Sequence, residues 1–103
     1  MTETILMPAG RLDTAAAPAF EREMIAATAA GGSRLLIDLA NLAYVSSAGL
    51  RVFLVAAKRL RAEGGRIALC GLQPQVAEVF DISGFAAIVP VYADRQAALA
   101  ALR

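Results

Sequence analysis

Short apolar runs alternate with longer amphipathic stretches along the chain. The apolar runs predict four strands, at Thr4 to Pro8, Arg34 to Leu39, Arg66 to Cys70 and Ala87 to Tyr92. Elsewhere apolar residues recur three or four positions apart, which predicts helices over about 14–30, 47–63, 74–80 and 95–102. This alternation predicts a single α/β layer structure.

The middle of the chain joins a buried strand to a helix that begins at two serines. After the strand, a brief turn through Ala40-Asn41 leads toward Ser46 and Ser47, where the helical pattern starts. A helix N-terminus carries unpaired backbone N–H groups and the positive end of the helix dipole. A serine there is explained by helix capping alone. It also suits phosphorylation, because the helix N-terminus would hold a phosphate of about −1.5 to −2 charges.

The predicted helix after Ser47 has two different faces. At 100° per residue, one face gathers apolar residues and is expected to be buried: Leu50, Phe53, Leu54, Ala57 and Leu60. The opposite face mixes apolar and basic residues beside the serines: Arg51, Val52, Val55, Arg59 and Ala62. Two exposed valines are ordinary on a protein surface. The mixture of valine and arginine nevertheless favours a partner-binding surface over a solvated face.

Asp38 interrupts the central apolar strand near its end, close to the serines. One interpretation is a carboxylate that caps a turn or a helix. The other is a site residue that orients the serine or pairs with a partner. A carboxylate without a histidine or a metal makes only a modest base, so no catalytic role is expected of Asp38.

Other polar residues mark the ends of predicted helices. Asp13 and Thr14 are expected to cap the first helix, although Pro18 belongs near a first turn and favours a later start. Asp81 and Ser83 are expected to stabilise the end of the short helix by local hydrogen bonds to the backbone.

Composition narrows the class of protein. The 103 residues fit one domain spanning 1–103, and the net charge of +1 gives no electrostatic footprint for nucleic acid. No run approaches the roughly 18 apolar residues of a membrane span, and no signal peptide is visible at the start. The single cysteine cannot form an internal disulfide. We therefore expect a cytoplasmic protein with no nucleic-acid partner and no direct membrane contact.

The chain has no histidine, which removes most catalytic options. Neither a Ser-His-Asp triad nor a Cys-His pair can form. With one cysteine and dispersed carboxylates, no metal site is expected either. The sequence therefore predicts a protein that is not an enzyme and has no cofactor, and an activity on phosphate esters is disfavoured.

Four stretches together resemble the STAS domain, the module of anti-sigma factor antagonists and of sulfate-transporter tails. They are Gly10-Arg11-Leu12-Asp13, the strand Leu36 to Leu39 with Tyr44 to Leu50, Gly64-Gly65, and Phe80-Asp81-Ile82-Ser83-Gly84. The resemblance spans nearly the whole chain in the right order. It implies an α/β fold with a small mixed sheet of four to five strands and about four helices. The stand-alone length points to the antagonist branch of the family.

The resemblance implies a phosphorylation site at Ser47, with Ser46 as the second choice. The family pattern is commonly Asp-Ser-Ser/Thr-Gly-Leu, which places Ser46 where the aspartate usually stands and Ala48 at the next hydroxyl. The partner-binding residues expected from pattern and resemblance together are Asp38, Ser46, Ser47, Arg51, Val52, Val55 and Arg59.

The resemblance also implies partner switching. In that scheme the unphosphorylated antagonist binds an anti-sigma factor, a serine kinase of the histidine-kinase-like ATPase type, and so frees the sigma factor. The kinase then phosphorylates the antagonist with its own ATP and Mg²⁺, the complex dissociates, and a serine phosphatase resets the switch. The alternative is an accessory subunit of an ATP-driven lipid transporter, which would use the same surface without phosphorylation.

Overall fold

The computed structural model describes residues 3–29 and 34–103. Four helices are present: α1 (Ala17–Thr28), α2 (Ser47–Ala62), α3 (Pro74–Ile82) and α4 (Arg95–Leu102). The main sheet has the strand order β1 (Glu3–Leu6), β3 (Arg34–Asp38), β5 (Arg66–Cys70) and β6 (Val91–Tyr92). A second sheet pairs β2 (Gly10–Leu12) with β4 (Leu42–Val45). The predicted α/β class with four helices is confirmed.

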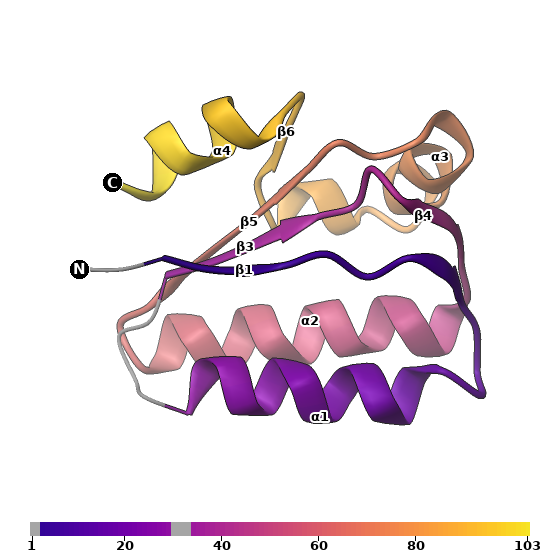
Figure 1. Ribbon diagram of the computed structural model, residues 1–103, viewed down its shortest axis with the longest axis horizontal. Helices are drawn as coiled ribbons and strands as arrows, with labels where there is room; N and C mark the ends of the chain where they lie inside the picture. The colour runs from indigo at the N-terminus through magenta and orange to yellow at the C-terminus, as the bar shows by residue number, and fades with distance from the viewer. Residues whose placement is uncertain (1–2, 30–33) are drawn as a thin grey trace.

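The layers follow from the connections between strands. Figure 1 shows α1 and α2 side by side beneath the main sheet, with α4 above it. Every strand pair among the described residues is parallel, so the expected mixed sheet is corrected on this point. The reason is that each step along the main sheet crosses over through a helix, which returns the chain to the same end.

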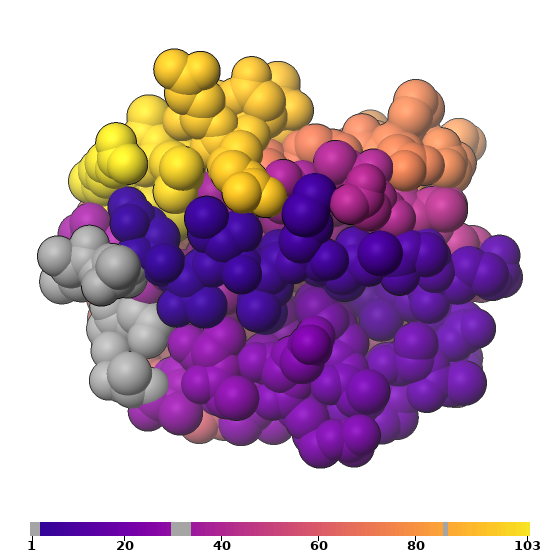
Figure 2. All heavy atoms as spheres, in the orientation of Figure 1, coloured from indigo at the N-terminus to yellow at the C-terminus, as the bar shows by residue number. Residues whose placement is uncertain are grey.

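Strand β3 is buried on both faces, as its apolar sequence predicts. Leu35 and Ile37 face the larger core between the sheet and helices α1 and α2, whereas Leu36 faces a smaller core under α4. Four phenylalanine rings fill the larger core, with centroid separations of 4.9–6.3 Å: Phe20, Phe53, Phe80 and Phe85. Strand β1 pairs with β3 and forms one edge of the main sheet. Figure 2 shows β1 within an indigo band between α1 and α4.

Several boundaries differ from the sequence-based expectation. Strand β4 was not predicted, because only Leu42 and Val45 of its four residues are buried and no clear alternation results. The expected strand from Ala87 to Tyr92 shrinks to Val91–Tyr92, since residues 85–87 form a 3₁₀ turn and Pro90 has no N–H to donate. Helix α1 ends at Thr28, and its expected end at Ala30 lies outside the described residues.

In the part of the chain that the structure describes, no helix is long and apolar enough to cross a membrane.

Candidate functional site

The two serines begin α2 and have different surroundings. Ser46 is the N-cap residue, and its Oγ accepts a hydrogen bond from the Gly49 N–H at 3.1 Å. The Ser46 N–H donates to the Leu12 carbonyl at 2.9 Å, which fixes the serine to the end of β2. Ser47 is the first helical residue, and its side chain is exposed. The cap is therefore Ser46, and the Ser47 hydroxyl is not used for capping.

The start of α2 approaches β2 closely at a glycine. Gly49 is buried, and a Cβ on it would lie 2.9 Å from both the Cγ and the carbonyl oxygen of Leu12. The same Cβ would lie 3.0 Å from Cγ2 of Val45. Contacts this short admit no side chain, so the absence of a Cβ at Gly49 lets the helix that carries Ser47 pack against β2 and β4.

Two open grooves meet at Ser47. One lies between the starts of α1 and α2 and is lined by Thr14, Ala17, Pro18, Glu21, Ser47, Ala48, Arg51 and Val52. The other lies between α2 and the end of α3 and is lined by Ser47, Leu50, Arg51, Leu54, Ser83, Phe85 and Ile88. Ser47 and Arg51 line both grooves. Ser47 and Arg51 therefore form the ridge between the two grooves, where a partner could contact them.

The electrostatics at this ridge favour an anion on Ser47. Helices α1 and α2 begin at the same end of the molecule, so the positive ends of both dipoles point toward it (Figure 1). Only the third N–H of α2 is met by the Ser46 cap. Arg51 is exposed one turn after Ser47 and forms no ion pair within the described residues. The start of α2 and an arginine one turn away therefore favour negative charge at Ser47.

The expected helix caps are partly corrected. The N-cap of α1 is Ala16, so neither Asp13 nor Thr14 is the capping residue. Asp13 instead closes the preceding turn, where its Oδ1 accepts from the Ala16 N–H at 2.9 Å. Thr14 is exposed and lines the groove beside Ser47. The later start of the helix that Pro18 indicated is confirmed.

At the end of α3 the two expected roles separate. Ser83 donates its hydroxyl to the Phe80 carbonyl at 3.0 Å, as predicted. The Asp81 side chain is exposed and forms no hydrogen bond within the described residues, so its predicted capping role is wrong. The Asp81 backbone carbonyl takes part instead, because it accepts the Gly84 N–H at 3.2 Å.

Asp38 does not belong to the serine site. Its side chain shares the α4 face of the sheet with Leu36, whereas Ser47 begins a helix on the opposite face. Its Oδ2 accepts from Arg95 Nε at 3.1 Å and Nη2 at 2.9 Å, and its Oδ1 accepts from the Ala40 N–H at 3.0 Å. Asp38 is 8% exposed, so the expectation that it orients the serine or contacts a partner is corrected. It is a structural anchor for α4.

Cys70 lies opposite Asp38 in the neighbouring strand and is fully buried. Burial raises the pKa of the Cys70 thiol, and the nearby Asp38 carboxylate raises it further. The thiol therefore stays protonated and unreactive in the folded protein.

Val52, which was expected on the partner-binding face of α2, is buried as well. Val52 is 5% exposed and packs toward α1, where it lines a small cavity with Met24, whereas Val55 is 44% exposed. Arg59 is also exposed and pairs with Glu63 at 3.8 Å. Val52 is therefore removed from the surface. The prediction failed because α2 packs against α1 as well as the sheet, so its buried face is rotated toward Val52 and Leu54 is only half-buried.

Sequence reasoning missed the residues that complete the two grooves. Glu21 comes from α1, and Phe85 and Ile88 come from the segment after α3, far from Ser47 along the chain. No local pattern signals this meeting. The sequence did hold one signal of tertiary packing near Ser47, which is Gly49. Glycine is unfavourable inside a helix unless a close approach of another element requires it. Among the described residues, no cluster of metal-ligating side chains is present.

Comparison with known proteins identifies the family. The family model of the STAS domain matches residues 2–98, and the chain therefore belongs to the STAS domain family. It is 48% identical over 94 residues to the "putative anti-sigma factor antagonist BtrV" of Bordetella bronchiseptica, covering 91% of this chain and 81% of that one. It is 34% identical over 85 residues to the anti-sigma-B factor antagonist of Bacillus subtilis, covering 82% and 77%.

Solved structures agree on the fold. The "putative anti-sigma factor antagonist" of Thermotoga maritima superimposes with a TM-score of 0.89 at 24% identity, covering 96% of this chain and 86% of that one. The Bacillus protein SpoIIAA in its phosphorylated form superimposes with a TM-score of 0.71 at 23% identity, covering 96% and 89%. SpoIIAA in its unphosphorylated form gives a TM-score of 0.75, also at 23% identity, covering 90% of this chain and 82% of that one.

Proposed function

We propose that this protein is an anti-sigma factor antagonist whose binding to an anti-sigma factor is switched off by phosphorylation of Ser47. The observation that carries the proposal is the position of Ser47, an exposed hydroxyl on the ridge between two grooves at the start of α2. The partner would be an anti-sigma factor that is also a serine kinase, with a serine phosphatase to reverse the modification. All three would meet in the cytoplasm, where the kinase finds ATP.

Ser47 is a better acceptor than Ser46. A kinase must reach the hydroxyl and place it in line with the γ-phosphate of ATP. Ser47 is exposed, whereas Ser46 is half-buried and its oxygen is held by the Gly49 N–H at 3.1 Å. Phosphorylating Ser46 would therefore disturb the cap, while phosphorylating Ser47 would not.

The proposed partner surface centres on Ser47 and Arg51 and continues along the exposed side of α2. Val55 and Arg59 follow at intervals of four residues, so all four side chains form one stripe. Ser46 borders this stripe at the N-terminus. The grooves on each side offer apolar contacts, notably at Leu54 and Ile88.

The switch would act at the interface and leave the fold intact. A phosphate on Ser47 would be stabilised by the start of α2 and by Arg51, one turn away. The same dianion would have to be desolvated against a partner surface that fits a neutral hydroxyl. SpoIIAA has been solved in both forms, which supports the view that this fold accommodates the modification.

The test uses purified protein, ATP and a histidine-kinase-like serine kinase sought among the neighbouring genes, with the phosphate mapped by mass spectrometry. The wild-type protein and the Ser46→Ala variant are expected to be phosphorylated, and the Ser47→Ala variant is not. Ser47→Ala should still bind the kinase, because it retains the neutral surface. Phosphorylation of Ser47→Ala at the wild-type rate would overturn the assignment of the acceptor, and no binding of the unphosphorylated protein would overturn the function.

A further inference from the structure

The second edge of β5 is only partly covered. Strand β6 pairs with Leu69 and Cys70 alone, so Arg66 to Ala68 have no strand on that side. Across this edge the Leu69 N–H donates to the Pro90 carbonyl at 3.0 Å. Hydrogen-bonding direction alternates along a strand, so the N–H and C=O of Ile67 point to the same edge. They have no strand partner there among the described residues, and such groups favour a further strand.

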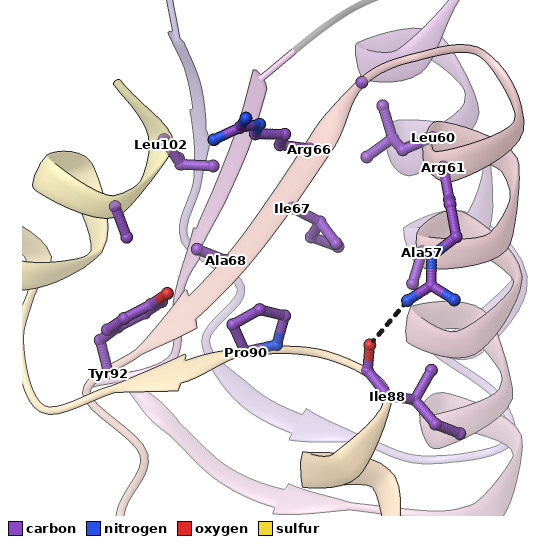
Figure 3. Close-up of a pocket in the computed structure, with 12 residues that line it drawn as sticks. Ala57, Leu60, Arg61, Arg66, Ile67, Ala68, Ile88, Pro90, Tyr92 and Leu102 are labelled. Carbon is purple, nitrogen blue, oxygen red and sulfur yellow. Dashed lines mark hydrogen bonds between the residues drawn. The ribbon is translucent and has the colours of Figure 1, made fainter.

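A pocket of about 280 Å³ lies where that strand would run (Figure 3). One wall is formed by Ala57 and Leu60 of α2, and the other by Ala101 and Leu102 of α4. The segment that contains Pro90 borders the pocket next to β6. Three uncovered residues of β5 amount to about 10 Å of strand edge. The pocket is therefore a slot along a sheet edge, with apolar walls on both faces of the sheet.

Two cations border this slot. Arg61 and Arg66 are exposed lining residues, and no acidic residue is among the residues that line the pocket. Arg61 donates from Nη2 to the Ile88 carbonyl at 3.3 Å, which holds its guanidinium beside the slot. Arg66 forms no ion pair within the part of the chain that the structure describes. The charge at the slot is therefore positive and uncompensated.

We propose that this slot binds an extended peptide segment of another protein, which adds to the free edge of β5. Successive side chains of an extended segment point to opposite faces, so two consecutive apolar residues would meet the α2 and α4 walls. Acidic residues on either side of them would point to opposite faces, one toward Arg61 on the α2 side and one toward Arg66 on the α4 side. The site is separate from the phosphorylation switch, since its lining includes neither Ser47 nor Arg51. It gives the protein a second docking surface.

The probe is the capped peptide acetyl-Glu-Val-Val-Glu-amide, whose symmetric sequence suits either strand direction. Titration of this peptide into ¹⁵N-labelled protein should shift the amide signals of Arg66, Ile67 and Ala68. It should also slow hydrogen exchange at Ile67. The dissociation constant of the peptide should be no higher than about 5 mM. The Gln-Val-Val-Gln analogue should bind at least about threefold more weakly, as expected for exposed ion pairs. A version methylated on both valine nitrogens should not bind, because it cannot complete the ladder.

Variants separate this site from general charge attraction. Arg66→Gln should weaken binding of the glutamate peptide by about threefold or more and leave binding of the glutamine peptide unchanged. Lys58→Gln removes an exposed cation of α2 that does not line the slot, so it should change neither. Both variants are checked for an unchanged fold by their spectra. Equal binding of the glutamate, glutamine and methylated peptides, shifts confined to other surfaces, or no shift at about 5 mM would each overturn the proposal.

Discussion

A Cβ on Gly49 would lie 2.9 Å from the carbonyl oxygen of Leu12, so the first turn of α2 rests directly on the backbone of β2. The Ser46 N–H donates to that same carbonyl at 2.9 Å. The position of Ser47 is consequently fixed by contacts of the backbone on both sides. This rigidity explains why we expect phosphorylation to change the surface of the protein rather than its fold.

Gly49→Ala should destabilise the protein. Alanine favours a helix over glycine by about 1 kcal/mol, but the added methyl group meets a backbone carbonyl that cannot move alone. We expect overpacking to outweigh the helix propensity and to leave a net loss of about 1–2 kcal/mol in the free energy of unfolding, measured in urea. Lys58→Ala, at an exposed position of the same helix, should change it by less than about 0.5 kcal/mol. A Gly49→Ala variant as stable as the wild type would show that the close approach is not restrictive.

Two valines of α2 should respond differently to a glutamate. Val52→Glu buries a carboxylate between α1 and α2 and should cost about 3 kcal/mol or more, enough to unfold a marginally stable domain. Val55→Glu should leave stability within about 0.5 kcal/mol and weaken partner binding by about 1–3 kcal/mol, because the charge enters an interface unpaired. Urea unfolding and binding titrations measure both. Equal losses of stability would contradict the orientation of α2.

Ser47→Asp should separate stability from binding. The carboxylate lies at a helix N-terminus, where negative charge is favourable, so the thermal midpoint should not fall. Binding of the anti-sigma factor should weaken at least about tenfold, which is 1.4 kcal/mol. The phosphorylated protein should bind more weakly still, since phosphate carries more charge and three acceptor oxygens. A fall of many degrees in the melting midpoint of the phosphorylated form would replace this local switch with a conformational one.

Asp38→Asn should lower stability without affecting the switch. The substitution removes the charge that holds Arg95 of α4, and hydrogen bonds to charged groups contribute about 1.5–3 kcal/mol each before solvent screening. Because the Arg95 side chain is 42% exposed, we expect a loss near 1 kcal/mol, measured in urea. Phosphorylation of Ser47 should proceed at the wild-type rate, as on the wild-type control. A slower rate with intact stability would return Asp38 to the functional site.

Local patterns predicted what depends on neighbours in the chain. The apolar run at β5 and the helical spacing of α4 gave the observed bounds, because a buried strand and an amphipathic helix each carry their own period. The serines at a helix start were also readable, since a helix N-terminus follows from local sequence. The short motifs and their order also predicted membership of the STAS domain family, which the match over residues 2–98 confirms.

The tertiary structure decided everything that depends on a second element. Helix α1 buries Val52, and Arg95 of α4 pairs with Asp38 on the other face of the sheet. Neither residue therefore lies on the predicted partner surface. The position of Ser46 as the cap depends on β2, because the Ser46 N–H donates to the Leu12 carbonyl at the end of that strand. The grooves beside Ser47 and the slot at β5 join residues that are distant along the chain. A periodic pattern records that a side chain is buried but carries no information about which element buries it, because hydrophobic burial is non-directional.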